Sequence, residues 1–383
     1  MFRSTRIAVA VLLVLLILPA LALAGNVVFL VRTGTDAEGN PMFRMADSRD
    51  TYLSSLFELT QSSKALYETT RYYDAVQKEK VAAALQQQGV TGAQLQYAQA
   101  NFQTEPVFIE VTNSRSGSYN DWKGRFSVIY PNGQAYSFSS PRVVYALGGD
   151  VARSGNRSLI EQTLVHEVAH GVMAKAEGRN NLPDTPWLSK PHSGGSVSDD
   201  KLAFIEGWAE FIGAYFTGRQ TIAGDPAGAI QTNWYGRGKN AQQLINTEGW
   251  NATVFYHIAT QGASQNAMWK MTQVMARTQP QNTWQLLTNL VRYYPELAPT
   301  VNQVVYADSG GQIAGPGGQT GYASNYGTSG GASGNAGAPI KKNKTWVIVA
   351  PAGNRNVGYV VDSVTPIIRV NTSAVLPAPE IAL

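Results

Sequence analysis

One helical segment near the middle of the chain constrains the fold more than any other feature, because it carries a His-Glu-x-x-His pattern, TLVHEVAHGV. Ser158 and Glu161, just before the pattern, have the spacing of a capping box, in which the serine caps the helix start and the glutamate reaches back to it. Gly178 is a typical residue at a helix C-terminus. We therefore expect a helix over about residues 159–177 with the pattern in its middle.

The two histidines of the pattern share one face of this helix. A helix advances by about 100° per residue, so His166 and His170 lie one turn apart and Glu167 lies at the edge of the same face. The far side is apolar and consists of Leu164, Val165, Val168, Ala169 and Val172. We expect the apolar side to pack on a core and the imidazoles to line a cleft.

Two imidazoles one turn apart can bind the same zinc ion, and the glutamate between them can reach a water on that ion. Zinc lowers the pKa of such a water, and the glutamate can then take its proton as a general base. With four histidines in the whole chain, a chance match is rare. The pattern therefore predicts His166 and His170 as zinc ligands and Glu167 as the catalytic base of a hydrolase.

A catalytic zinc ion needs a third protein ligand. The extended pattern H-x-x-G-x-x-H requires glycine at 173 and histidine at 176, where this chain has Met173 and Ala176. Cysteine is absent, so a thiolate ligand is excluded. Downstream, SDDKLAFIEGWAEFIGAYFTGR predicts a second helix that begins at Asp199 or Asp200 and ends near Gly218.

The second helix carries two acids one turn apart, Glu206 and Glu210, beside small residues on an otherwise apolar surface. A buried unpaired carboxylate is costly, and a zinc ion is a suitable partner for it. Either glutamate can therefore be the third ligand, and Asp199, Asp200 and His192 are further alternatives. His192 belongs to the loop LSKPHSGGS, which we expect at the surface near the mouth of the cleft.

HEVAH followed by a helix with EGWAEF resembles the gluzincin metallopeptidases, a broad group that includes zinc aminopeptidases and bacterial collagenases. In those families the first glutamate of an E-G-x-A segment binds zinc, and the resemblance gives this role to Glu206. Glu210 would then hold a ligand histidine in place. The resemblance covers two segments between residues 158 and 218. His170 and Glu206 are further apart than in the aminopeptidases, so their substrate-binding features are not transferred.

A peptidase also needs a donor for the oxyanion that forms on the attacked carbonyl. Tyr235 and His257 are our catalytic candidates, with Tyr256 as an alternative, although each residue is equally typical of a core. Glu248 begins another helix with EGW and resembles a feature of some secreted HExxH peptidases, or is simply an acid at a helix N-terminus. The segments FSVIYP and FIEVT could offer a strand edge for an extended peptide.

The first 24 residues read as a secretory signal peptide. Arg3 and Arg6 precede an apolar run of 18 residues, and Ala22-Leu23-Ala24 is a small-x-small cleavage site. An uncleaved membrane anchor is the alternative, because the run is at the lower limit for spanning a bilayer. No later stretch approaches membrane-spanning length, so we expect a secreted or periplasmic protein without stable membrane insertion after cleavage. The absence of cysteine, and so of disulfides, indicates a bacterial exporter.

Charge excludes one class of partner. Loss of the leader lowers the formal net charge of +4 by two, which is too small for a nucleic-acid binder. The expected partner is a polypeptide substrate. Two other hypotheses remain: a catalytically inactive binding or surface protein of zincin fold, which the intact Glu167 disfavours, and a zinc amidase acting on cell-wall material.

The order of patterns predicts an α+β protein, with a mostly helical zincin-like catalytic domain and a small upstream sheet. We expect the following segments: a β-hairpin over 25–45, the catalytic domain over 46–308, a Gly/Ser-rich flexible linker over 309–338 and a short β-rich module over 339–383. The module contains three strand-like runs, TWVIVAP, VGYVVD and PIIRVN, and could contact a surface or partner.

Overall fold

The computed structural model describes residues 27–222, 228–261, 266–316, 346–352 and 355–361. The fold is α+β, as the sequence predicts. The described residues divide into a larger unit, within 27–80 and 105–316, and a smaller unit, within 81–104 and 346–361. The expected signal peptide lies outside the described residues. None of the described helices is both long enough and apolar enough to cross a membrane.

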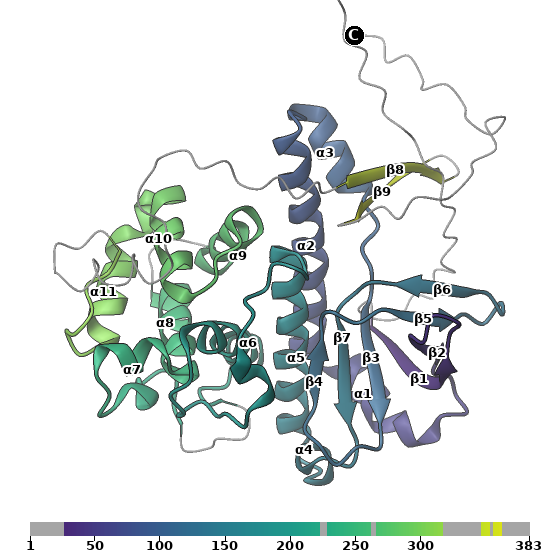
Figure 1. Ribbon diagram of the computed structural model, residues 1–383, viewed down its shortest axis with the longest axis horizontal. Helices are drawn as coiled ribbons and strands as arrows, with labels where there is room; N and C mark the ends of the chain where they lie inside the picture. The colour runs from purple at the N-terminus through teal and green to yellow at the C-terminus, as the bar shows by residue number, and fades with distance from the viewer. Residues whose placement is uncertain (1–26, 223–227, 262–265, 317–345, 353–354, 362–383) are drawn as a thin grey trace, which may run out of the picture. The chain divides into compact units, whose positions relative to one another are not determined.

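The larger unit contains a seven-stranded mixed sheet with strand order β4-β7-β3-β1-β2-β5-β6 (Figure 1). The strands are β1 (Val27–Thr35), β2 (Pro41–Met45), β3 (Val107–Thr112), β4 (Tyr119–Asp121), β5 (Phe126–Ile129), β6 (Ala135–Phe138) and β7 (Arg142–Ala146). β1 and β2 form the hairpin expected near the N-terminus. This hairpin is part of the main sheet, because β1 pairs in parallel with β3 and β2 pairs in parallel with β5.

The edges of the sheet differ from our expectation. FIEVT lies in β3, between β7 and β1, and FSVI forms β5, between β2 and β6, so neither strand is an edge. The prediction that one of them offers a free edge to a peptide is wrong. The edge strands are β4, which runs antiparallel to β7, and β6. Sheet order depends on pairing between distant segments, which local alternation of residues does not specify.

The helices upstream of the histidine pattern follow the sequence closely. They are η1 (Thr51–Leu53), α1 (Ser54–Ser62), α2 (Lys64–Gln87) and α3 (Gly92–Asn101). Gly89, just beyond α2, has a φ of 86°, a left-handed conformation that glycine adopts without strain and that typically ends a helix.

Helix α5 (Arg157–Glu177) is the central helix of the larger unit. It contacts β4 and β7 on one side and α6 (Asp200–Thr217) on the other, and α6 in turn packs against α8 (Glu248–Gln261) (Figure 1). The other elements of this region are α4 (Asp150–Arg153), η2 (Pro186–Ser189), η3 (Trp234–Gly236), α7 (Ala241–Ile245), α9 (Ala267–Thr278), α10 (Thr283–Tyr293), η4 (Pro295–Leu297) and α11 (Ala298–Asp308). The histidine pattern is thus enclosed between sheet and helices.

The first residues after α11, which we expected to begin a flexible linker, are packed against the larger unit. Ser309 is 2% exposed and Ile313 is 4% exposed, and Ile313 packs into the main hydrophobic core. Beyond residue 316 the linker lies outside the described residues. In the smaller unit, β8 (Trp346–Ala352) and β9 (Arg355–Val361) form an antiparallel hairpin, and α3 lies against β9. The first two strand-like runs of the tail fall in this hairpin, and the run PIIRVN lies outside the described residues.

Candidate metal centre

Helix α5 is capped by a different residue from the one we expect. The Leu159 N–H donates to the side-chain oxygen of Asn156 at 3.2 Å, so Asn156 is the N-cap and the predicted Ser158–Glu161 capping box is wrong. The Glu161 carboxylate instead accepts a hydrogen bond from the hydroxyl of Ser63. Asparagine caps as well as serine does, and a cap two residues earlier extends the first turn. The helix ends at Gly178, as predicted.

The predicted N-terminal cap and C-terminal glycine of α6 are both present. The Leu202 N–H donates to Asp199 at 2.8 Å, and Gly218, with a φ of 68°, follows the last turn. A Cβ atom at Gly207 would lie 2.6 Å from the Asn251 Cβ and 2.9 Å from the Glu248 carbonyl oxygen. Only glycine therefore allows α8 to pack directly against α6 at the residue that follows the candidate ligand.

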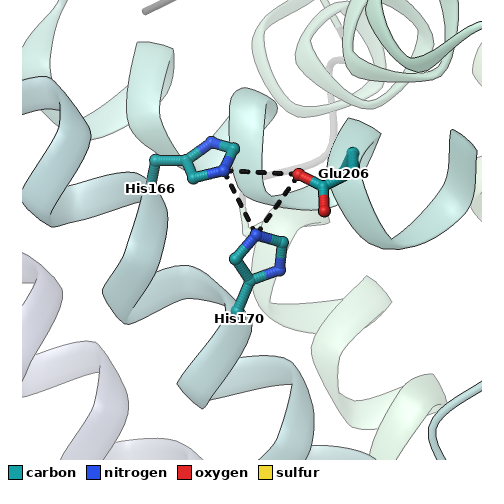
Figure 2. Close-up of side chains that lie close together, drawn as sticks. All are labelled: His166, His170 and Glu206. Carbon is teal, nitrogen blue, oxygen red and sulfur yellow. Dashed lines mark hydrogen bonds and ion pairs between the residues drawn. The ribbon is translucent and has the colours of Figure 1, made fainter. Parts of the chain in front are cut away.

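Three side chains from α5 and α6 converge (Figure 2). Oε2 of Glu206 lies 3.4 Å from Nε2 of His166 and 3.3 Å from Nε2 of His170, and the two Nε2 atoms are 3.1 Å apart. At metal–ligand bonds of about 2.0–2.1 Å, two corners of a tetrahedral site are about 3.3 Å apart. The three atoms therefore have the spacing of three ligands around one small cation, and the group could hold a metal ion.

Hydrogen bonding alone does not satisfy this cluster. Each imidazole presents Nε2 to the other, and where two ring nitrogens face each other only one of them can be the donor. The Nδ1 atom of His170 is buried and has no hydrogen-bond partner among the described residues, and Nδ1 of His166 has only the Glu210 carboxylate, 3.4 Å away. A cation bound between the two Nε2 atoms and the Glu206 carboxylate would satisfy all three facing atoms together, so the arrangement fits a bound cation better than a purely structural role.

The second glutamate of α6 lies behind one of the histidines. Oε1 of Glu210 is 3.4 Å from Nδ1 of His166, on the side of the ring away from Glu206. This is the position of an acid that orients a ligand imidazole, whereas Glu206 is the acid that faces both Nε2 atoms. Asp199 caps α6 and Asp200 accepts a hydrogen bond from Asn282 at 2.8 Å. The geometric group therefore contains neither aspartate.

The charges of the cluster stabilise one another. Burial would lower the pKa of His166, but the carboxylates of Glu210 and Glu206 outweigh burial and hold this pKa well above its usual value. Burial would raise the pKa of Glu206, but His170 and His166 hold it well below its usual value. The site therefore keeps Glu206 ionised, which a metal ligand requires.

Glu167 is buried beside the two histidines, with an exposed fraction of 6%, and its Oε2 atom has no hydrogen-bond partner among the described residues. Burial raises the pKa of its carboxyl group, partly offset by His166 and His170. A carboxylate with a raised pKa and a free oxygen is suited to accept a proton.

Two residues that the sequence analysis missed fix this part of the site. The Asn120 side chain, from edge strand β4, donates to the Glu167 carbonyl oxygen at 2.8 Å and ties α5 to the sheet. The Trp122 ring lies 6.0 Å from the ring of His170. Both belong to the segment SYNDW, which has no strand-like alternation, so its polar and aromatic content was the only signal.

The predicted oxyanion donors, His257, Tyr235 and the alternative Tyr256, lie outside the cluster of His166, His170 and Glu206. Nδ1 of His257 lies 2.8 Å from the Asp308 carboxylate and Nε2 lies 3.1 Å from the Gln231 carbonyl oxygen. Tyr235 is 2% exposed, and its ring is packed so closely on Gly249 that a Cβ there would lie 2.3 Å from it. Tyr256 accepts a hydrogen bond from the Gln231 side chain. The group of His166, His170 and Glu206 includes none of these residues, and a direct catalytic role for Tyr235 and His257 stays a prediction.

His192 is exposed, as expected for a residue in a surface loop, and it has one defined partner. Its Nδ1 atom lies 2.9 Å from Oε1 of Glu248, which is 3% exposed. The loop is tied to the start of α8, because the Gly249 N–H donates to the Gly194 carbonyl oxygen at 2.9 Å. Burial raises the pKa of Glu248 to about 7. The contact between His192 and Glu248 thus lies at the start of α8.

Comparison with protein-family models, with curated proteins and with solved structures found no match for this chain. Its function therefore has to be argued from the site itself.

Proposed function

We propose that the protein is a zinc-dependent metallopeptidase that binds one zinc ion through His166, His170 and Glu206. The observation that carries this proposal is the convergence of these three donor atoms beside the unpartnered carboxylate oxygen of Glu167. Two imidazoles and one carboxylate are a common ligand set of catalytic zinc, and three protein ligands leave one position for water or substrate. Peptide hydrolysis is the reaction that such a water performs in the gluzincin-type enzymes that the motifs resemble.

In the proposed reaction, the zinc ion, Glu167 and Glu210 have different roles. A bound zinc ion would lower the pKa of the attacking water and polarise the scissile carbonyl group. Glu167 accepts the proton of this water and returns it to the leaving amine. Glu210 orients the imidazole of His166 through its Nδ1 side.

A separate group has to stabilise the negative charge on the attacked carbonyl. His192 is the strongest candidate, because the buried Glu248 carboxylate contacts its Nδ1 atom at 2.9 Å and so can orient the ring. Tyr235 and His257 are the weaker candidates, since packing and hydrogen bonds account for their positions.

Edge strand β4 is the proposed docking site for substrate. It pairs with β7 on one side only, and Asn120 anchors it to the helix that carries the catalytic glutamate. An extended polypeptide can pair with the free side of such a strand through backbone hydrogen bonds. This strand takes the place of β3 and β5, which are interior.

We further propose that the protein acts outside the bacterial cytoplasm after removal of residues 1–24, and that the β8–β9 hairpin contacts a surface or partner. The basis is the sequence of the leader and of the tail. A catalytically inactive binding protein and an amidase acting on cell-wall material are the competing functions.

The decisive activity experiment uses the purified mature chain on casein and, in parallel, on purified cell-wall polymer, each with and without a chelator. We expect casein cleavage that the chelator abolishes and that added zinc restores. Glu167→Gln is the control, because it should keep the metal and lose cleavage. Release of products from wall polymer but not from casein would favour the amidase. If Glu167→Gln kept its activity on both substrates, the proposed mechanism would be excluded.

A further inference from the structure

A pocket lies between the loop that carries His192 and the segment around η3. It has a volume of about 390 Å³ and is lined by Gly195, Trp234, Tyr235, Arg237 and Lys239. This is near the lower end of the range for small-ligand pockets, so it has room for one amino-acid side chain or a chain end. The sequence analysis assigned no role to the two cations.

Among the described residues, no ion pair includes Arg237 or Lys239, and the neighbouring acid Asp308 is paired with His257. The Lys239 ammonium donates to the Tyr235 carbonyl oxygen at 2.7 Å. Burial lowers the pKa of Lys239. A partly buried, uncompensated cation favours an anionic ligand.

The segment that carries the cations is held in place. Asn233 is left-handed, with a φ of 49°, and its side chain donates to the Asp308 carbonyl oxygen. At the other end, the Gln312 side chain donates to the Lys239 carbonyl oxygen at 3.0 Å. The Arg237 guanidinium lies over the Trp234 ring at 4.4 Å, which restricts its plane and leaves its N–H edge available.

Backbone contacts connect the pocket with the metal centre. The Tyr235 ring packs on Gly249, and the carbonyl group of the preceding residue, Glu248, packs on Gly207. Gly207 directly follows Glu206 in α6. Gly195 belongs to the same loop as His192. The pocket is therefore joined to the helix that carries Glu206 through the start of α8 and the loop of His192.

We propose that this pocket is a carboxylate-binding subsite of the peptide cleft, in which Arg237 and Lys239 bind an acidic side chain or the C-terminal carboxylate of the substrate. An arginine fork matches a carboxylate with two parallel hydrogen bonds, and lysine adds a point charge. The inference rests on the proposed peptidase function, and it adds the chemical class of the preferred substrate.

Binding tests this subsite independently of cleavage. The probes are fluorescently labelled octapeptides that carry glutamate or glutamine at each position in turn, each with a free or an amidated C-terminus. Their affinity for the zinc-loaded Glu167→Gln protein is measured by fluorescence anisotropy. We expect the carboxylate form to bind about tenfold more tightly than its neutral counterpart, which is the effect of one charge-assisted hydrogen bond.

Matched variants locate the effect. Arg237→Gln should remove most of the preference, and Arg237→Glu should reverse it in favour of peptides with lysine. Arg292→Gln is the control, because Arg292 is another exposed arginine and its loss changes the net charge equally. Circular dichroism checks the fold of each variant.

The outcomes separate the two possible sources of the carboxylate. A preference for glutamate that survives amidation assigns an acidic side chain, whereas a preference for the free terminus assigns the chain end. Equal binding of charged and neutral peptides, or an equal loss in Arg292→Gln, overturns the subsite. If wild type shows chelator-sensitive cleavage but binding shows no carboxylate preference, the subsite is overturned and the peptidase function stands. If peptides with a carboxylate bind preferentially but wild type cleaves none of them, the peptidase function is overturned and the carboxylate-binding site stands.

Discussion

Two buried groups in the larger unit combine histidine with carboxylate, and their hydrogen bonding differs. His257 has an acceptor at each ring nitrogen, the Asp308 carboxylate and the Gln231 carbonyl oxygen. The ring can therefore donate from both nitrogens as an imidazolium. In the cluster of His166 and His170, each Nε2 faces the other. Nδ1 of His170 has no hydrogen-bond partner among the described residues, and Nδ1 of His166 has only the Glu210 carboxylate, 3.4 Å away.

The comparison teaches how a structural histidine differs from a candidate ligand. Around His257 the folded chain itself provides every partner, so nothing further has to bind. Around His166 and His170 the chain brings three donor atoms together at the spacing of a metal tetrahedron, and this group could hold a cation. Burial is similar in both places, so the difference lies in hydrogen bonding and not in exposure.

The largest effect should come from removing the carboxylate that faces both imidazoles. Glu206→Ala should weaken zinc binding by more than about 100-fold, because loss of a residue that only supports a ligand already costs about 10–100-fold. Peptidase activity should disappear with the metal. The measurement is zinc affinity by competition with a chromophoric chelator, and His257→Leu is the matched control that should bind zinc normally. Unchanged affinity in Glu206→Ala would transfer the ligand role to Glu210.

The next effect separates catalysis from metal binding. Glu167→Gln should lower kcat by about 10²–10⁴-fold, the usual contribution of a general base, with zinc content unchanged. Steady-state kinetics together with metal analysis of the same sample checks this. A variant that keeps full kcat would show that another group takes the proton.

A smaller effect is expected for the acid behind His166. Glu210→Gln should weaken zinc binding by about 10–100-fold, because the imidazole loses its orienting carboxylate while all three ligands stay in place. The same chelator competition measures it. A loss as large as that of Glu206→Ala would mean that both acids bind the metal directly.

The smallest effect concerns the satisfied histidine. His257→Leu leaves the buried Asp308 carboxylate unpaired and should lower the free energy of unfolding by about 2 kcal/mol. Burial would lower the pKa of His257, but its hydrogen bond to Asp308 raises the pKa above the usual 6.5. The stability of the charged pair is therefore fully present below about pH 6.5 and is lost as the pH rises through the raised pKa.

The difference between wild type and His257→Leu should consequently shrink between pH 6 and pH 9. Urea unfolding of both proteins across this range measures it. A difference that grows with pH would show that the ring is neutral in the folded protein, and a loss of zinc in this variant would remove the distinction between the two histidine groups.

Local signals in the sequence predicted the helices of the site. The histidine pattern, the Asp199 cap and the glycines at 178 and 218 all lie within single helices, where side-chain spacing and caps act over a few residues. The cap of α5 was misplaced by two residues because Asn156 and Ser158 are both good capping residues.

Long-range pairing could not be predicted in the same way. Val27 pairs with Val107, and Asn120 bonds to the backbone of Glu167, across large separations in sequence. The ion pair of His192 and Glu248 joins a polar loop to a helix start more than fifty residues later. Such contacts depend on the packed arrangement of whole elements, so composition identifies the loop but not its partner.

The central claim is that His166, His170 and Glu206 bind one zinc ion. Its most direct test is elemental analysis of the mature wild-type protein, purified in metal-replete buffer, beside the folded double variant His166→Ala/His170→Ala. The account predicts about one zinc per wild-type chain and none in the variant. No bound metal in the wild type, a different metal in its place, or equal zinc in both proteins would contradict it.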